Sequence, residues 1–167
     1  MFGYRHIYHA GNFADVVKHV VLLSLLRALQ RKDTPLYFHD THAGIGRYDL
    51  RSPQAQKKRE FEAGIMRLLD APSPPAEVQD YLAAIRSLNP KGNLRWYPGS
   101  PRLASYALRP QDRMVLTELN PADHDALKKE FTDTRKVEVR LEDAYRGLKA
   151  QLPPRERRGL VLSDPPY

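Results

Sequence analysis

Apolar residues recur along the chain with two periods, one typical of helices and one typical of short buried strands. Near the amino terminus they recur every three or four positions, which predicts a helix capped by Asn12 with Asp15 in its first turn. The apolar positions of this helix are Val16, Val17, Val20, Val21, Leu25, Leu26 and Leu29. A short apolar run at 36–38 predicts a strand, and residues 39–46, which contain two glycines, predict a turn. The chain therefore begins as an α/β unit.

The alternation of helix and strand is interrupted in the middle of the chain. Residues 54–69 and 76–88 both have helical spacing, and a proline-rich joint lies between them. We interpret this stretch as an inserted helical hairpin and assign residues 53–91 to a small helical subdomain. Residues 1–52 and 92–167 would then form the main domain.

Strands and helices alternate regularly again in the second half of the chain. Ser100 followed by Pro101 predicts a capped helix that continues to Leu108. The later elements are a strand at 113–119, a helix at 121–131, a strand at 136–141, a helix at 144–152 and a strand at 159–163. This order predicts an α/β fold with a parallel, doubly wound sheet, whose ligands bind at the carboxyl ends of the strands.

Each predicted strand runs into an acidic residue at its carboxyl end. These residues are Asp40, Glu118, Asp143 and Asp164. In a parallel sheet all four should face one crevice. The alternative is that each acid only caps the following helix, which applies most directly to Asp143, because a helix begins at the next residue. Glu118 differs, since Asn120 provides that cap and leaves the carboxylate free to accept the hydroxyls of a ribose.

The turn Ala43-Gly44-Ile45-Gly46 follows the first strand. Its glycines let the backbone approach a ligand closely, as nucleotide-binding α/β folds require. A Gly-x-Gly turn is a weak signal by itself, and the third glycine of the dinucleotide fingerprint is missing.

The strongest chemical signal is the segment Ser163-Asp164-Pro165-Pro166-Tyr167 at the end of the last strand. The two prolines keep Asp164 extended and make the loop rigid before a ligand binds. Adenine N6 is a poor nucleophile, so a catalyst must hold the amino group while it turns toward a methyl donor. The Asp164 carboxylate and the Pro165 carbonyl would accept its two N–H groups, and Tyr167 would stack on the extruded base. Asp-Pro-Pro is also an ordinary turn, but the shared crevice favours chemistry here.

The Asp-Pro-Pro-Tyr motif resembles motif IV of the amino-methyltransferases, and the whole chain resembles the RlmJ family of bacterial large-subunit ribosomal RNA adenine-N6 methyltransferases. Matching segments run from end to end: Tyr4-Arg5-His6, His9-Ala10-Gly11-Asn12, Ala14-Asp15-Val16, Lys18-His19, Asp40-Thr41-His42-Ala43-Gly44, Gly46-Arg47-Tyr48, Tyr97-Pro98-Gly99-Ser100-Pro101, Leu116-Thr117-Glu118-Leu119 and Asp164-Pro165-Pro166-Tyr167. The resemblance implies a Rossmann-like methyltransferase core with a small helical insertion, acting on N6 of an adenine in 23S ribosomal RNA.

The resemblance also implies roles for individual residues. Those implied to bind S-adenosylmethionine are Lys18, His19, His42, Ser100, Glu118, Asp143, Ala144 and Asp164. Asp164 would be the catalytic residue, assisted by Pro165 and Tyr167. Tyr4 and His6 would contact the RNA substrate.

Two departures from the family pattern bear on this expectation. Family members often have glycine where this chain has Ala144, which a contact through the backbone N–H tolerates. The family also continues for many residues beyond the motif, where this chain stops at Tyr167. We therefore expect a truncated chain that lacks the remaining strands and one wall of the base pocket, and that methylates poorly alone. A source protein with the mass of these 167 residues and full activity would contradict this.

The composition is compatible with a nucleic-acid partner. Lysine and arginine number 27 against 20 acidic residues, giving a net charge of +7 that favours a polyanion. The absence of cysteine excludes a disulfide framework and a thiolate zinc site. No apolar stretch has the length of a membrane span, and the amino terminus lacks the pattern of a secretory signal. We expect a cytoplasmic monomer that binds 23S ribosomal RNA and neither a membrane nor a metal.

Three alternatives stay open from the residues alone. His39-Asp40-Thr41-His42, with His6, His9 and His19, suggests a metal-dependent phosphodiesterase, although neighbours in an extended segment point to opposite faces. The basic runs Lys57-Lys58-Arg59 and Arg155 to Arg158 suggest an RNA-binding module without catalysis, or simply a solvated face. DNA adenine or a protein glutamine would suit the same Pro-Pro loop, and only the family resemblance favours ribosomal RNA.

Overall fold

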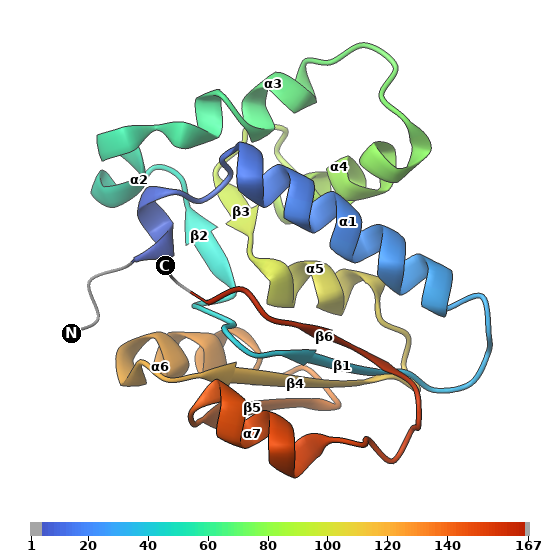
Figure 1. The fold of residues 1–167 in the computed structure, drawn as a ribbon. Helices are drawn as coiled ribbons and strands as arrows, with labels where there is room; N and C mark the ends of the chain where they lie inside the picture. Colours follow the sequence, from blue (N-terminus) through green and yellow to red (C-terminus); the bar gives the residue numbers. More distant parts are fainter. Residues whose placement is uncertain (1–4, 166–167) are drawn as a thin grey trace.

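A four-stranded parallel sheet forms the centre of the computed structural model, which describes residues 5–165 (Figure 1). The strand order is β5–β4–β1–β6, and the strands are Val137–Leu141, Arg113–Glu118, Tyr37–Asp40 and Gly159–Leu162. The strands β1, β4 and β5 lie side by side in chain order. The chain then crosses to the other side of β1, where it forms β6. This reversal makes the boundary between β1 and β6 the topological switch point, where open α/β sheets bind ligands.

The register brings the acidic strand ends to one edge of the sheet, as predicted. Asp40 ends β1, two residues beyond the predicted strand, and lies opposite Leu116 of β4 and Leu162 of β6. Glu118 ends β4 opposite Leu141 of β5. The carboxyl ends of all four strands therefore meet beside the switch point.

Helices cover both faces of the sheet. The helices α1 (Phe13–Leu29) and α5 (Ser100–Ala107) lie over one face, and α7 (Ala144–Gln151) lies over the other (Figure 1). The helix α6 (Pro121–Glu130) is tied to α5 by an ion pair between Arg102 and Glu130. Within residues 5–165, no helix combines the length and the apolar character needed to cross a bilayer.

The first helix begins as the sequence predicts. The Asn12 side chain accepts a hydrogen bond from the Asp15 N–H at 2.9 Å and so caps α1. The inner face of the helix is buried in the core at Leu22 and Leu26, whereas Val21 on its outer face is 50% exposed. The apolar residues predicted for this helix therefore lie on its exposed face as well as on the face that packs against the core.

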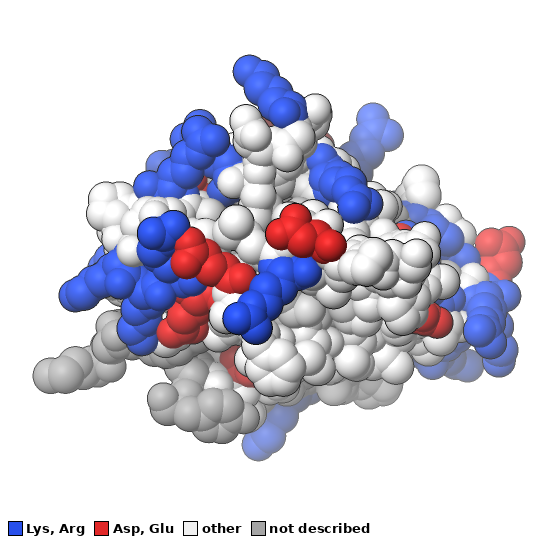
Figure 2. All heavy atoms as spheres, turned by 90° about the horizontal axis from the view of Figure 1, so that it is seen from above, with Lys and Arg blue, Asp and Glu red and all other residues white. Residues whose placement is uncertain are grey.

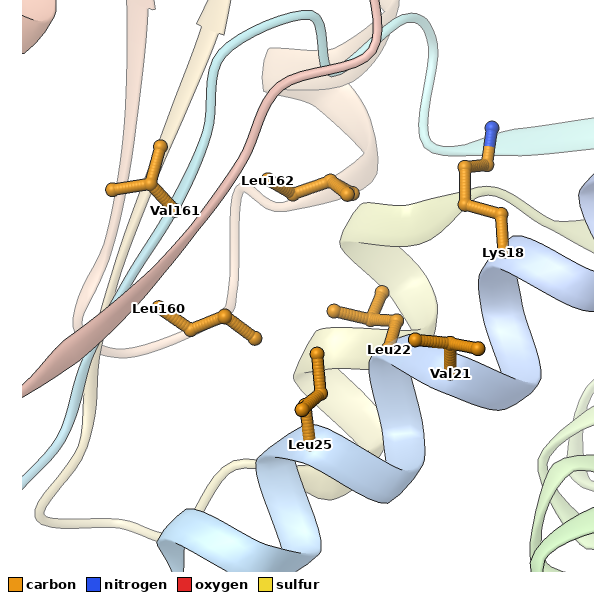
Figure 3. A pocket seen from close by; sticks show the side chains of 7 residues that line it. All are labelled: Lys18, Val21, Leu22, Leu25, Leu160, Val161 and Leu162. Carbon is orange, nitrogen blue, oxygen red and sulfur yellow. The ribbon is translucent and has the colours of Figure 1, made fainter.

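The outer face of α1 and strand β6 enclose an apolar groove of about 230 Å³ (Figure 3). The side chains of Leu160 and Leu162 point toward α1, and Val161 points away from it (Figure 3). Lys18 stands at one end of the groove with its ammonium group directed away from the apolar side chains (Figure 3). The groove thus lies between α1 and β6, with Lys18 at one end.

The predicted helix over 54–69 is wrong, because the chain breaks it twice. It forms α2 (Pro53–Lys58), a 3-10 turn η2 (Glu60–Glu62) and α3 (Ile65–Leu69). Arg59 adopts a left-handed conformation with φ 51°, which ends α2. Gly64 lies so close to the start of α1 that a Cβ there would be 2.6 Å from the carbonyl carbon of Asn12.

The insertion packs on α1 and shares its core. The helix α4 (Ala76–Leu88), which matches the predicted second helix, buries Tyr81 and Ile85 in the same apolar cluster as Leu26 of α1. The division of the chain into a main domain and a subdomain at 53–91 stays a prediction.

Two short strands that the sequence pattern did not predict flank the insertion. The strands β2 (Arg47–Asp49) and β3 (Trp96–Pro98) pair antiparallel, with Tyr48 opposite Tyr97. The inserted helices therefore begin and end at a two-stranded ribbon that follows the glycine turn.

Substitution of Gly64 by alanine tests how closely the insertion is packed on α1. The new methyl group would collide with the backbone of Gly11 and Asn12, so we expect Gly64→Ala to lower the free energy of unfolding by about 3 kcal/mol. The control is Gly92→Ala, where a Cβ meets no atom within 4 Å and only the left-handed backbone, with φ +80°, costs about 1 kcal/mol. Chemical denaturation measures both values, and equal losses would contradict this account of Gly64.

Candidate functional site

The carboxylate of Asp164 lies beyond the end of β6 and is held by α1. Its Oδ2 accepts a hydrogen bond from Lys18 Nζ at 2.7 Å. The same ammonium group lies 3.1 Å from Oδ1 of Asp15. Burial alone would lower the pKa of Lys18, but the two carboxylates outweigh it and raise that pKa above its ordinary value. Lys18 is thus a charged bridge between α1 and the Asp164 loop.

His42 stands where the predicted acids converge. Burial lowers the pKa of His42, and the carboxylates of Glu118, Asp164 and Asp143 each act against this shift. Glu118 ends β4, and Asp164 and Asp143 follow β6 and β5. Acids from the carboxyl ends of three strands therefore act on the His42 side chain.

Contacts of Thr41 fix the position of His42 at the switch point. The Thr41 N–H donates to the Leu162 carbonyl at 3.0 Å, which extends the pairing of β1 with β6. The Thr41 hydroxyl lies 2.8 Å from Nδ1 of His42. On the other side, the Ala43 N–H donates to the Thr117 carbonyl of β4 at 3.0 Å. The turn is therefore attached to both neighbouring strands before the glycines begin.

Glu118 is not the free carboxylate that the sequence argument assumed. Its Oε2 accepts from the Gly44 N–H at 2.9 Å, and its Oε1 accepts from the Asn120 N–H at 2.8 Å. Asn120 does cap α6, as predicted. Each carboxylate oxygen can accept a further hydrogen bond, so a ribose can still donate to Glu118.

The glycine turn has no room for a side chain at its first glycine. Gly44 has φ +61°, and a Cβ there would lie 2.5 Å from the hydroxyl oxygen of Tyr48. The bond from Gly44 to Glu118 therefore depends on glycine at this position, because the Tyr48 hydroxyl fills the place that a side chain would take.

Asp143 serves as the cap of α7, which was the alternative interpretation of this residue. Its Oδ1 accepts from the backbone N–H groups of Tyr145 and Arg146 at 3.1 and 3.0 Å. Ala144, the first residue of the helix, is buried, and the Tyr145 ring stands edge-on to His42 at 6.2 Å between centroids. A cofactor role for Asp143 would have to be compatible with this capping role.

Asp40 has an unusual environment that the sequence did not reveal. It is 1% exposed, and its Oδ1 accepts from the His42 N–H at 3.2 Å. Within the described part of the chain, its Oδ2 has no hydrogen-bond partner. Burial raises the pKa of the Asp40 carboxyl to about 6, although the Ser100 hydroxyl and the His42 N–H act against the rise. A buried oxygen without a donor indicates a place where a ligand donor fits.

Ser100 is part of this environment and does not cap α5. The structure places Gly99 at the cap position and Ser100 in the first turn of the helix, so the predicted cap is wrong. The Ser100 side chain is therefore available to the crevice, where it influences Asp40.

His19 belongs to a buried hydrogen-bond chain. Its Nδ1 lies 2.9 Å from the Tyr97 hydroxyl, which lies 2.9 Å from the Tyr81 hydroxyl. Burial lowers the pKa of His19 to about 3, so the imidazole is neutral near pH 7. His19 thus connects α1 with β3 and α4, next to Lys18.

The remaining predicted site residues lie near the amino terminus and the carboxyl end. His6 lies against Asp15, with 2.8 Å between Nε2 and Oδ2, and its ring faces Tyr48. Pro165 follows Asp164 and is half-buried. Tyr4 and Tyr167 lie outside the described residues.

The histidines considered as metal ligands have other partners. Both ring nitrogens of His39 are engaged, one 2.8 Å from the Thr117 hydroxyl and the other 3.1 Å from the Tyr37 hydroxyl, on the face of β1 away from Asp40. Among residues 5–165, no group of three or more histidine and acidic side chains is arranged to hold a metal ion.

The basic runs are partly neutralised by local partners. Arg59 pairs with Glu62, and Arg158 donates to the Leu29 carbonyl and to Thr34. Figure 2 shows the lysine and arginine side chains of one face in several separate groups, with acidic side chains beside some of them. On this face the charge therefore forms no continuous basic stripe.

Comparisons with known proteins identify the family to which the chain is similar. The sequence matches the family described as RsmJ, Ribosomal RNA large subunit methyltransferase D, RlmJ, over residues 33–167. Proteins named Ribosomal RNA large subunit methyltransferase J from Haemophilus influenzae and Escherichia coli (strain K12) are each 46% identical to it. Each alignment covers 100% of this chain and 60% of the relative, so the chain spans about three fifths of those relatives' length.

A solved structure supports the same fold. A crystal structure of a Legionella pneumophila protein superposes with a TM-score of 0.84 at 42% sequence identity, covering 92% of this chain and 56% of that chain. With the parallel sheet described above, this confirms the predicted Rossmann-like α/β fold.

Proposed function

Because the chain belongs to the RlmJ family of ribosomal RNA large subunit methyltransferases, we propose that it transfers a methyl group from S-adenosylmethionine to N6 of an adenine in 23S ribosomal RNA. The family resemblance expected from the sequence motifs is thereby confirmed. The observation that best supports the proposed chemistry is the position of Asp164 beyond β6, bonded to Lys18 and close to His42.

The residues at the strand ends fit S-adenosylmethionine, which when bound supplies a methyl group activated on a sulfonium. Glu118 has acceptor capacity for the two ribose hydroxyls, and the Gly44 N–H holds its carboxylate in place. The unpartnered Oδ2 of Asp40 fits the ammonium group of the methionine part. These three residues would orient the cofactor across the switch point.

The other predicted cofactor residues would complete the pocket. Ser100 and His42 flank Asp40, and the Asp143–Ala144 pair forms the wall at α7. His19 would support the pocket with its neutral ring, since its Nδ1 is bonded to Tyr97 in the core.

The adenine amine would be held by the loop after β6. A carboxylate offers about four acceptor sites on two oxygens, so Asp164 can keep Lys18 on Oδ2 and accept an N6 proton on Oδ1. The Pro165 carbonyl would accept the second N–H. As the new C–N bond forms, the bond between the methyl carbon and the sulfonium sulfur would break and leave a neutral thioether. The displaced proton would pass to Asp164 or to water, which requires no strong base because the methylated ammonium is acidic. Tyr167 would stack on the base.

The RNA would approach from the amino-terminal side, where Tyr4 and His6 were predicted to contact it. The surplus of 27 basic over 20 acidic residues favours attraction of the RNA backbone. A ribosomal RNA substrate would place the protein in the cytoplasm, and methyl transfer of this kind calls for neither a metal nor a second subunit.

Replacement of Asp164 separates an enzyme from a binding module. We expect Asp164→Ala in the complete gene product to lower methyl transfer roughly 10²–10³-fold, while the variant still binds S-adenosylmethionine or RNA. Asp133→Ala, which removes an exposed carboxylate after α6, is the control. The assay uses labelled methyl donor with unmodified 23S ribosomal RNA, adenine-containing duplex DNA and protein as acceptors, followed by nucleoside analysis. The proposal would be overturned if the wild-type protein placed the labelled methyl group anywhere other than in N6-methyladenosine of the RNA. It would also be overturned if the Asp164→Ala variant were active.

The raised pKa of Asp40 predicts a pH-dependent affinity for the methyl donor. Below pH 6 the carboxyl is mostly protonated and loses its attraction for an ammonium group. Binding of S-adenosylmethionine should therefore weaken as the pH falls through 6, by roughly tenfold per pH unit, with release of one proton. Isothermal titration calorimetry in two buffers of different ionisation enthalpy measures both effects.

Two variants assign this pH dependence to Asp40. Asp40→Asn should bind weakly and without the step near pH 6. Asp112→Asn removes another buried carboxylate, which accepts from the Leu36 N–H at the opposite end of the sheet, and should keep the step. An unchanged step in Asp40→Asn would refute the assignment.

A further inference from the structure

Asp15 is a buried carboxylate that connects three parts of the amino-terminal region. It is 2% exposed and lies in the first turn of α1. Its Oδ2 accepts from the Gly11 N–H at 3.0 Å and lies 2.8 Å from Nε2 of His6. Its Oδ1 lies 3.1 Å from Nζ of Lys18. In the sequence, Asp15 is marked only as an acidic residue in the first turn of the predicted helix and as part of the matching segment Ala14-Asp15-Val16.

The carboxylate is ionised despite its burial. Burial by itself would raise the pKa of Asp15, but the hydrogen bond to His6 and the nearby charges, including that of Lys18, bring it well below its ordinary value. A buried charge is costly unless it is paired and hydrogen-bonded. The partners of Asp15 are therefore what keeps a negative charge at this position.

Helix capping does not explain this charge. The cap of α1 is already provided by Asn12, whose side chain accepts from the Asp15 N–H. The bond from Gly11 needs only a neutral acceptor, which an asparagine would supply. A neutral side chain would not supply the attraction for Lys18, whose ammonium group is shared with Asp164 on the other side.

We propose that Asp15 is a positioning residue for methyl transfer, which acts through Lys18 to set the position of the Asp164 carboxylate. This inference rests on the proposed function of Asp164. With Asp15 present, Lys18 is held between two carboxylates. Without its charge, Lys18 would pair with Asp164 alone and compete with the adenine amine for that carboxylate. The contact with His6 ties the same residue to the segment predicted to meet the RNA.

The test is a double-mutant cycle in the complete gene product. Asp15→Asn should lower kcat roughly tenfold, with S-adenosylmethionine affinity changed less than twofold. In a Lys18→Met background the same substitution should change kcat less than twofold, because residues that act through one contact are not additive. If the asparagine amide does not fit at this position, the variant Asp15→Ser is used instead, because serine removes the charge with a smaller side chain.

A second readout reports the contact without turnover. The pKa of Lys18, measured from the pH dependence of its reductive methylation by mass spectrometry, should fall in Asp15→Asn because a neighbouring carboxylate is lost. Asp112→Asn is the matched control for loss of a buried carboxylate, and should change neither the Lys18 pKa nor kcat.

The outcomes separate this inference from the proposed function. An active wild type in which Asp15→Asn leaves kcat and the Lys18 pKa unchanged would overturn the inference alone. So would an Asp15→Asn effect of equal size with and without Lys18, which indicates general destabilisation. A wild type that transfers no methyl group to the RNA would overturn the proposed function, and the inference with it.

Discussion

The pairing of β1 with β4 on one side and with β6 on the other is the constraint on which the site depends. Parallel pairing aligns the strands so that their carboxyl ends lie at one edge, and the change of direction after β5 opens a crevice beside Asp40. Thr41 and Ala43 extend these pairings beyond the strand. The geometry of the candidate site is therefore built mainly from backbone hydrogen bonds, and its side chains occupy positions that the sheet provides.

Charge joins elements that the sheet alone does not hold. An apolar groove lies between α1 and β6, and polar contacts join them at its two ends, Lys18 with Asp164 after β6 and Arg158 before β6 with the Leu29 carbonyl. The position of the proposed catalytic carboxylate thus depends on a helix that begins more than a hundred residues earlier. This arrangement makes the start of α1, with its cap and its buried Asp15, part of the site.

Much of this fold follows from local sequence signals. Asn12, Asn120 and the apolar strands were predictable because capping and burial depend on neighbouring residues. The break in the 54–69 helix was not, since Gly64 packs against the distant Gly11 and Arg59 adopts a conformation that its residue type rarely takes. The three-residue strands β2 and β3 are too short for a periodic signal, and the insertion separates them.

The site was predictable to a similar degree. The strand-end rule located the acids, but the roles of their oxygens depend on contacts distant in sequence. Glu118 was expected to be free and instead accepts from Gly44, while Ser100 was expected to cap a helix and faces Asp40. Asp15 could not be found from its neighbours, because its importance comes from the link through Lys18 to the far end of the chain.

The hydrogen-bond chain from His19 through Tyr97 to Tyr81 has a consequence for the behaviour of the protein in acid. The folded protein keeps this imidazole neutral, with a pKa of about 3, whereas in an unfolded chain it titrates near its ordinary value of 6.5. Between these two pH values the unfolded chain binds a proton at this histidine and the folded protein does not. The contribution of His19 to the free energy of unfolding is therefore complete above pH 6.5 and decreases as the pH falls below that value. Mild acidification therefore lowers the free energy of unfolding through this buried imidazole before it protonates the paired carboxylates.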